Sequence, residues 1–474
     1  MSKLVKATSW TTLATVVNLV LTMIQLAFLV RILAPSVFGQ FAVVNMVIEV
    51  FVAFALGGIS NFLIYKRDAD QRTCNAIYFL ALGIGTIFSI ILFLFTPIIA
   101  SALGYEAIVQ ELRLATLLLV VSSLSSQYQA VGMKNFKHQS IAQIDIAAKL
   151  LSFGFAISFP ELELLCLVGS VIIYQLAKLI GFMFFLGKYV NLSFSTNSTV
   201  YREAFNYGIF DFGSQAINII RKQLDVMILA VTLPSSEMGV YHVLKQLASR
   251  PAQALQPIIG KVALPAFAEV KDIKERFMRV YKDFYFLQLF VLAFIYMPVI
   301  VAAELVVTLF FGESYAQYSL VLSLLAGFWF IRVAAANLVG PLVQSTGLTK
   351  RNFMWNIYVM VPNALVIYIS SMFGVEALVL SMTIFQLILF PIVNFYFIKY
   401  ITGVEFSYSI KSMLILVSAF TIPLVLFYNF LVPLIPDMWF MQEVSVAVLT
   451  AVVALVLYFI YSDIKQSVVR IKGF

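Results

Sequence analysis

The chain has 474 residues, of which 62% are hydrophobic and 11% are charged, and its mean hydropathy is +0.98. This composition excludes a water-soluble globular protein and is typical of an integral membrane protein. The net charge of +8 at pH 7 does not require nucleic-acid binding, because most basic residues lie in short segments between apolar runs.

Apolar runs of about twenty residues recur along the whole chain, and each is long enough to cross a hydrocarbon core of about 30 Å as a helix. They predict an all-α membrane protein with about 14 transmembrane helices. The predicted spans are 8–33, 38–65, 76–101, 113–133, 139–159, 164–187, 206–231, 240–267, 283–311, 316–344, 353–373, 376–399, 409–433 and 440–462.

The loops between these spans predict the topology, because lysine and arginine are retained on the cytoplasmic side. With the N-terminus in the cytoplasm, most of the 31 basic residues fall in cytoplasmic segments, whereas Arg31 and Arg113 fall in outer ones. We therefore expect a multi-pass protein with both termini in the cytoplasm.

An internal repeat is indicated at an offset of 200 residues. One face of the first predicted span carries a stripe of polar residues at helical spacing, and one face of the seventh span carries a second stripe at the same spacing. The first stripe is Thr11, Thr15, Asn18, Thr22 and Gln25, and the second is Asp211, Gln215, Asn218, Lys222 and Asp225. Gly39 and Gly239, in the turns that follow, are also 200 residues apart. The repeat predicts six-helix bundles over 1–190 and 200–400, related by a pseudo-two-fold axis, and two additional helices over 405–474.

Charged residues also occur inside the predicted spans, where each costs about 2.5 to 3.5 kcal/mol at a lipid-facing midplane. The basic ones are Lys149, Lys178, Arg221, Lys222, Lys245, Arg250 and Arg332, and the acidic ones are Glu49, Asp145, Asp211, Asp225 and Glu304. Asp145 and Lys149 are four residues apart, as are Arg221 and Asp225, so these pairs either neutralise each other within a helix or contact a substrate.

The remaining cations have no acid at helical spacing toward the inside of their own span. All seven basic residues, Lys149 and Arg221 included, are predicted to line a cationic cavity for an anionic substrate such as a phosphate or pyrophosphate, which the two polar stripes also line. Glu49, Asp145 and Glu304, with Asp211 and Asp225, are candidates for a proton or sodium site, and salt bridges are the alternative role.

Signals of an enzyme are missing from the sequence. The chain has two histidines, His138 and His242, and neither a Walker A motif nor a dinucleotide-binding motif. We expect no catalytic residue, no metal and no cofactor, so that energy comes from a proton or sodium gradient, the membrane potential or consumption of the product.

Several short motifs resemble those of bacterial polysaccharide flippases. They are Arg31–Gly39 (RILAPSVFG), Gly57–Asn61 (GGISN), Gln223–Leu229 (QLDVMIL), Met238–Tyr241 (MGVY), Arg250–Pro251, Pro257–Pro265 (PIIGKVALP), Gly340–Pro341 and Gly347–Lys350 (GLTK). Together they resemble the Wzx-type branch of the MOP exporter superfamily, and especially the subgroup of colanic and teichuronic acid exporters.

This resemblance implies a fourteen-helix MOP fold in the bacterial inner membrane. It implies a flippase that moves undecaprenyl-pyrophosphate-linked oligosaccharide repeat units to the outer leaflet by alternating access, for lipopolysaccharide or exopolysaccharide biosynthesis. The implied partners are the lipid-linked oligosaccharide, membrane lipids, a polysaccharide polymerase and export machinery.

Three alternatives remain open from the sequence. A lipid-linked peptidoglycan precursor flippase would share the cationic cavity. A multidrug exporter of the same superfamily would require a cavity dominated by acids. An integral-membrane polysaccharide polymerase or ligase would require a sizeable outer loop, and the predicted outer loops are short.

Overall fold

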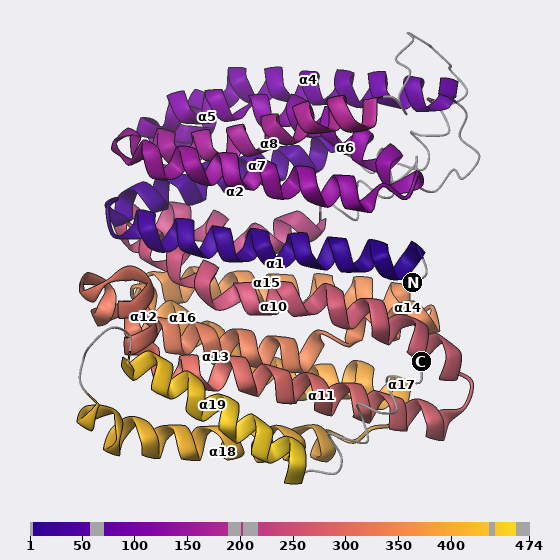
Figure 1. Ribbon diagram of the computed structural model, residues 1–474, viewed down its shortest axis with the longest axis vertical. Coiled ribbons are helices and arrows are strands. Elements are labelled where there is room, and N and C mark those ends of the chain that lie inside the picture. The colour runs from indigo at the N-terminus through magenta and orange to yellow at the C-terminus, as the bar shows by residue number, and fades with distance from the viewer. Residues whose placement is uncertain (1–2, 57–70, 188–200, 202–216, 436–440, 461–474) are drawn as a thin grey trace. The chain divides into compact units, whose positions relative to one another are not determined.

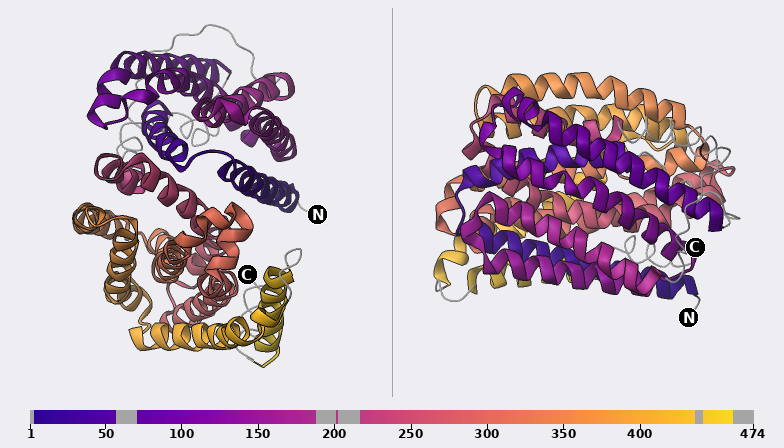
Figure 2. Two further views of the ribbon diagram at one scale, coloured as in Figure 1. Left: turned by 90° about the vertical axis from the view of Figure 1, so that its left-hand side faces the viewer. Right: turned by 90° about the horizontal axis from the view of Figure 1, so that it is seen from above.

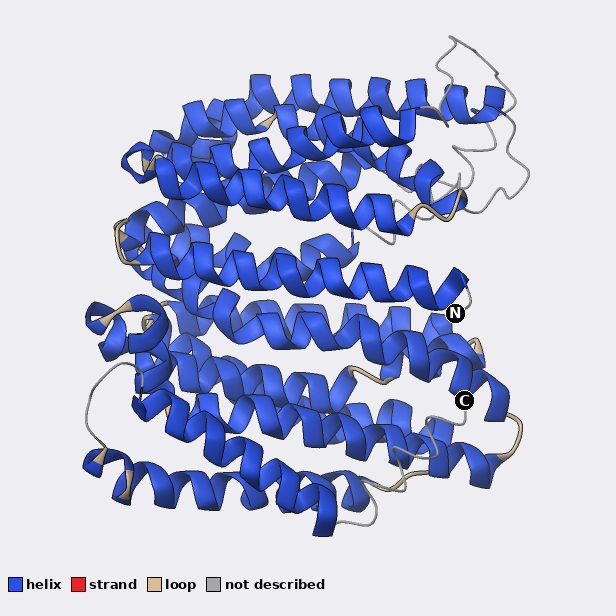
Figure 3. Ribbon diagram, in the orientation of Figure 1, coloured by secondary structure: helices blue, strands red, loops and turns tan. Residues whose placement is uncertain are grey.

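The computed structural model describes residues 3–56, 71–187, 201, 217–435 and 441–460, and within these ranges the chain is helical and has no strand (Figure 3). Twelve of the described helices are long and apolar enough to cross a membrane. The prediction of an all-α, multi-pass membrane protein is confirmed, while the total of about 14 spans stays a prediction.

The first of two compact units comprises Met1–His242. Its helices run alongside one another (Figures 1 and 2, indigo to magenta). They are α1 (Lys3–Val30), α2 (Pro35–Leu56), α4 (Gln71–Ala102), α5 (Val109–Ala115), α6 (Leu117–Lys134), α7 (His138–Ser158), α8 (Leu164–Leu186), a helical stretch at 217–232, and the start of α10 (Ser235–Val270), with short 3₁₀ turns at Glu106–Ile108 and Pro160–Leu162.

Packing in this unit places α7 between α1 and α8, and α6 between α4 and α8. Tyr78, Tyr128 and Phe182 lie in the apolar core that results. Other apolar side chains face outward; Phe184 is 82% exposed and Ile98 is 64% exposed. Exposed apolar side chains along such helices are what contact with lipid requires.

The second unit comprises Val243–Phe474 (Figures 1 and 2, orange to yellow in its later helices). Its elements are the rest of α10, α11 (Lys274–Val301), α12 (Ala303–Phe311), α13 (Ser319–Ala336), α14 (Val339–Thr346), α15 (Thr349–Ser371), α16 (Val375–Val393), the π-helix η5 (Asn394–Lys399), α17 (Tyr400–Thr402), α18 (Phe406–Phe430) and α19 (Met441–Ile460), with 3₁₀ turns at Glu313–Tyr318 and Val432–Leu434.

The core of the second unit is built around α11, which packs against α13 and α18. Tyr281, Tyr285 and Tyr296 of α11 are all fully buried in this core. Burying large aromatic side chains contributes much of the packing between these helices. The unit therefore holds α13, which carries Arg332, firmly against α11.

Helix α10 corresponds to the predicted span 240–267. It is a continuous helix of 36 residues despite containing Pro251, Pro257 and Pro265. It also carries Lys245 and Arg250, and it is not among the twelve helices that qualify as candidate membrane spans. Its length of about 54 Å is sufficient to cross a bilayer.

The two compact units divide the chain within α10, whereas the repeat predicts bundles over 1–190 and 200–400. The stretch 217–232 belongs to the first unit, where Lys222 and Gln223 contact Glu49 of α2. The predicted bundles and the added pair at 405–474 therefore remain a prediction about the repeat, and the compact units follow a different boundary.

The first turns of α2 and α10 are in direct backbone contact at the two glycines of the repeat. A Cβ atom on Gly39 would lie 1.9 Å from the carbonyl oxygen of Ser235, and one on Gly239 would lie 1.7 Å from the carbonyl oxygen of Pro35. Backbone atoms cannot yield as a flexible side chain can. Both positions therefore require glycine, as close helix contacts in membranes commonly do.

We predict that Gly39→Ala or Gly239→Ala lowers the stability of the protein by about 1–3 kcal/mol, because the added methyl group forces the two backbones apart. Thermal unfolding of the purified protein in detergent measures this. Gly83→Ala on α4 is the matched control, because a Cβ there meets nothing within 4 Å. Equal unfolding temperatures for all three variants would contradict the close contact.

Candidate functional site

Asp145 on α7 is the centre of a polar network among three helices of the first unit. Tyr174 on α8 donates its hydroxyl to Oδ1 of Asp145 (2.6 Å), and Nζ of Lys178 lies 3.3 Å from the same oxygen. The side-chain amide of Asn18 on α1 donates to Oδ2. Lys178 and Asp145 are only 15% and 22% exposed, so their charges compensate each other away from bulk water.

A second polar layer lies farther along the same helices. Nζ of Lys149 donates to Oε1 of Gln25 (2.9 Å), and Nε2 of Gln25 donates to Oγ of Ser170 (3.4 Å). Ser152 donates to the backbone carbonyl of Ser170 (2.8 Å). Gln25 of the predicted polar stripe therefore contacts polar residues of both α7 and α8.

Two threonines of that stripe have a more local role. Thr15 donates its hydroxyl to the carbonyl oxygen of Thr11 (2.9 Å), and Thr22 donates to that of Asn18 (2.6 Å). Such bonds within one helix satisfy the hydroxyl without a second helix. Thr11 and Thr15 are exposed, whereas Gln25 is buried. Asn18 and Gln25 are thus the members that connect helices.

The sequence assigned Asp145 to Lys149 as one possible ion pair and found no acid for Lys178 in its own span. The ion pair that the structure shows for Asp145 is with Lys178 on the neighbouring helix. Lys178 therefore has an acidic partner outside its own span, and its role at a substrate site stays a prediction. Sequence spacing within one helix does not reveal a partner across a helix interface.

Glu49 on α2 forms a second charged cluster with the stretch 217–232. Its carboxylate accepts hydrogen bonds from Nζ of Lys222 (3.1 Å), Nε2 of Gln223 (2.5 Å) and Nδ2 of Asn45 (3.0 Å). The Lys222 side chain is 66% exposed and Glu49 is 34% exposed. Lys222 is therefore compensated across helices as well, but in a more open setting than Lys178.

Asp225 lies on the same stretch and is buried, with 7% exposure. The hydroxyl of Tyr241 on α10 donates to its Oδ2 (2.6 Å). Asn218 and Arg221 are exposed. Asp211 and Gln215, the first members of this predicted stripe, lie outside the described residues.

In the second unit, the buried Tyr296 of α11 contacts both α10 and α13, the helices that carry Arg250 and Arg332. The Tyr296 hydroxyl donates to the carbonyl oxygen of Ala248 (2.9 Å), and its ring contacts Phe330 (6.5 Å between centroids). Ala248 and Phe330 each lie two residues before one of the arginines. Through its contacts with Ala248 and Phe330, Tyr296 links α10 to α13, although these two residues are 82 positions apart in the chain.

Amide and aromatic groups hold these two guanidinium groups. Nη2 of Arg250 donates to Oε1 of Gln246 (2.9 Å). Arg332 lies over the rings of Phe328 and Trp329, with Cζ 5.7 Å and 5.1 Å from their centroids. Contacts of this kind orient a cation and leave its charge in place.

Lys245 on α10 is partly buried, whereas Glu304 is exposed in the first turn of α12. The sequence predicted one span over 283–311, but α11 ends at Val301 and a new helix begins at Ala303. Glu304 therefore lies at a helix junction, and not within a continuous span.

Sequence analysis missed the tyrosines that complete these clusters, Tyr174, Tyr241 and Tyr296. Tyr174 lies one helical turn before Lys178, and its ring is 5.1 Å from Nζ of that lysine, so helical spacing alone signals that contact. Nothing in the sequence signals the other two. The described residues include no group of three or more histidine, cysteine or acidic side chains able to hold a metal ion.

Comparison with known proteins shows the family to which the chain belongs. Residues 28–320, more than half of the chain, match a family described as "Polysaccharide biosynthesis protein". The chain belongs to this family.

Individual relatives agree with the family. The chain is 26% identical to the lipopolysaccharide biosynthesis protein WzxC of Escherichia coli, over 87% of its own length and 84% of that protein. It is 24% identical to the amylovoran biosynthesis protein AmsL of Erwinia amylovora, over 73% of its own length and 90% of that protein. The resemblance to Wzx-type proteins that the motifs predict is confirmed.

Solved structures share the fold of this family member. The lipid II flippase MurJ, in an inward closed conformation, aligns with a TM-score of 0.73 at 11% identity, over 96% of this chain and 99% of MurJ. A multidrug resistance MATE transporter of the MOP superfamily aligns with a TM-score of 0.59 at 14% identity, over 84% and 93% of the two chains. These likenesses confirm the predicted MOP-type fold.

We predict that Asp145→Asn lowers stability by about 2–3 kcal/mol, because it leaves the charge of Lys178 uncompensated at low exposure. Lys178→Met alone leaves Asp145 charged and is expected to cost a similar amount. The double variant should lose less than the two single losses combined, and thermal unfolding of all four proteins measures the difference. Strictly additive losses would show that the ion pair does not couple α7 to α8.

Proposed function

We propose that this protein is a flippase that moves undecaprenyl-diphosphate-linked oligosaccharide repeat units from the inner to the outer leaflet of the bacterial inner membrane by alternating access. Membership of a polysaccharide biosynthesis family and the likeness to WzxC support the process. The fold shared with MurJ and with a MATE transporter supports transport over enzymatic chemistry.

Arg250 and Arg332 are the observation that carries the proposal. Cationic side chains within apolar helices are expensive, and they commonly mark a path for an anionic substrate. Arg250 is oriented by an amide oxygen and Arg332 by aromatic rings. A guanidinium group oriented by such neutral contacts is suited to bind a phosphate in bidentate fashion.

The acidic residues suggest how transport is coupled to an ion. Asp145 compensates Lys178 and Glu49 compensates Lys222, so protonation of either carboxyl group would release a lysine toward the substrate. We propose coupling to a proton or sodium gradient or to the membrane potential, with no cofactor. Both termini lie in the cytoplasm in this proposal, and a polysaccharide polymerase and export machinery act on the product.

A lipid-linked peptidoglycan precursor flippase is the second candidate, because MurJ shares the fold over nearly the whole of both chains. Substrate range distinguishes the two functions. Expression of this protein in a strain depleted of its peptidoglycan precursor flippase should not restore growth, whereas expression in a strain lacking its polysaccharide repeat-unit flippase should restore surface polysaccharide. The opposite pattern would favour the second candidate.

We predict that Arg250→Ala and Arg332→Ala each slow translocation roughly ten- to hundredfold, the loss expected when one charge-assisted contact to the diphosphate disappears. The measurement uses protein reconstituted in vesicles with a fluorescent lipid-linked oligosaccharide. Arg276→Ala is the matched control, because Arg276 is half exposed and paired with Glu269 (3.4 Å). Unchanged transport by both variants would contradict the assignment of these two arginines to the substrate path.

A further inference from the structure

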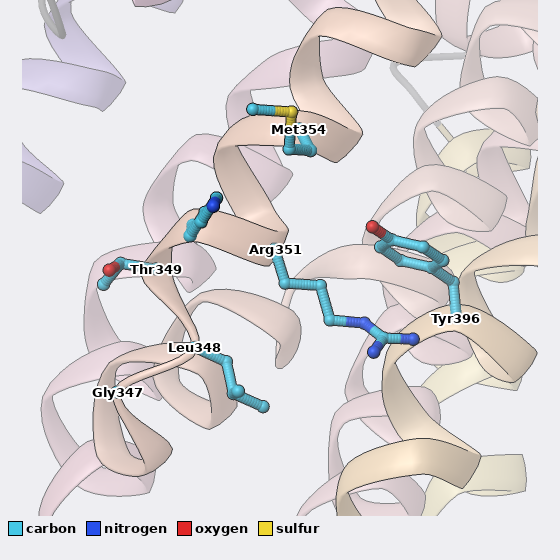
Figure 4. Close-up of a pocket in the computed structure, with 7 residues that line it drawn as sticks. Gly347, Leu348, Thr349, Arg351, Met354 and Tyr396 are labelled. Carbon is cyan, nitrogen blue, oxygen red and sulfur yellow. The ribbon is translucent and has the colours of Figure 1, made fainter.

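A pocket of about 420 Å³ lies where α14 turns into α15, and neither Arg250 nor Arg332 lines it (Figure 4). Gly347, Lys350, Arg351, Met354 and Tyr396 are among the residues that line it. Its volume is within the range of small-ligand sites, so it can accommodate a phosphate or diphosphate group.

The turn that forms this pocket depends on Gly347. This residue ends α14 with φ +75°, in the left-handed region that glycine adopts without strain. The chain then reverses, and α15 begins at Thr349. The reversal brings Lys350 and Arg351 into the first turn of a helix of 23 residues.

The π-helix η5 supplies the opposite wall. Cζ of Arg351 lies 4.2 Å from the ring centroid of Tyr396 and 3.8 Å from that of Tyr400, and Figure 4 shows Arg351 extending toward Tyr396. The ring of Tyr396 is in turn stacked on the ring of Trp355, with centroids 5.3 Å apart. Stacking fixes the guanidinium plane and leaves its N–H edges for acceptors.

Arg351 retains unused hydrogen-bonding capacity. Its Nε is buried and has no hydrogen-bond partner among the described residues. A buried donor without an acceptor costs about 1–3 kcal/mol, and an anion in the pocket would remove that cost. Lys350 beside it is exposed.

The surroundings are strongly positive. The sequence contains no aspartate or glutamate between Glu313 and Glu376. Glu405, which follows the π-helix, forms an ion pair with Lys399 (3.0 Å). The ion pairs found among the described residues do not involve Lys350 or Arg351. Lys350 and Arg351 therefore share one pocket whose described lining contains no acidic residue.

The position along the helix selects a lipid as the source of the anion. α15 is one of the helices apolar and long enough to cross the membrane, and the pocket lies at its first turn. Tyr400, whose ring contacts Arg351, is 61% exposed. Tyrosine and tryptophan gather at the boundary between hydrocarbon and headgroups, where lipid phosphates also lie.

We propose that Lys350 and Arg351, with Tyr396 bracing the guanidinium group, form a binding site for the phosphate groups of a membrane lipid. This proposal deepens the proposed function, because the predicted topology places the pocket at the cytoplasmic end, where a lipid diphosphate carrier would be loaded before reaching Arg250 and Arg332. Phosphate chemistry is common to that carrier and to an anionic phospholipid headgroup.

Equilibrium binding to the full-length protein in detergent tests the site. The probes are undecaprenyl diphosphate, phosphatidylglycerol and undecaprenol, which has the same chain and no phosphate. An Arg250→Ala, Arg332→Ala background removes the proposed central site. In that background, Lys350→Gln with Arg351→Gln should weaken undecaprenyl diphosphate binding at least about tenfold and leave undecaprenol binding unchanged. Lys411→Gln, an exposed lysine on α18, is the control.

Each outcome decides something. Tight binding of undecaprenyl diphosphate that phosphatidylglycerol does not displace supports a carrier site, whereas equal displacement supports a site for any lipid phosphate. Unchanged binding by the double glutamine variant overturns the proposal. If that variant unfolds at a lower temperature, Lys350→Gln alone keeps the test valid, because Lys350 is exposed. Because binding is measured without transport, a protein that fails to translocate oligosaccharide still tests this site.

Discussion

A charged side chain inside an apolar layer must contact polar or aromatic groups, and in the first unit of this protein those contacts cross from one helix to another. Asp145 draws Asn18 and Tyr174 together with Lys178, which joins α1, α7 and α8. Glu49 joins α2 to the stretch 217–232. The contacts that compensate these charges therefore also hold the helices together. Removing one of the charges would weaken the packing between the helices that it joins.

The constraint is met differently in the two units. In the first, Lys178 and Lys222 are matched by carboxylates, and a substrate phosphate would compete with those acids. In the second, the contacts that orient Arg332 and Arg351 are aromatic faces, which an anion need not displace. Among the seven cations that look equivalent in sequence, Lys178 and Lys222 thus pair with carboxylates, whereas Arg332 lies against aromatic rings.

Backbone geometry contributes where side chains cannot. Gly39 and Gly239 let α2 and α10 meet at their backbones, and Gly347 reverses the chain at the lipid-phosphate pocket. The π-helix η5 lies opposite that turn and carries Tyr396, in keeping with the frequent occurrence of π-helical turns at functional sites. These features position the candidate sites without adding any polar group to the membrane interior.

Composition and apolar run length are properties of the sequence, and they were sufficient to predict an all-α membrane protein, while the resemblance of its motifs to Wzx-type flippases implied the MOP-type fold. Helical spacing also predicted which face of α1 is polar. The partners of Lys178, Lys222 and Asp225 were decided only by tertiary structure. Periodicity reports neighbours three or four residues apart, whereas Asn18 meets Asp145 across 127 residues and Lys222 meets Glu49 across 173. Such contacts depend on which helices pack together, because only packing brings side chains so distant in the chain within bonding distance.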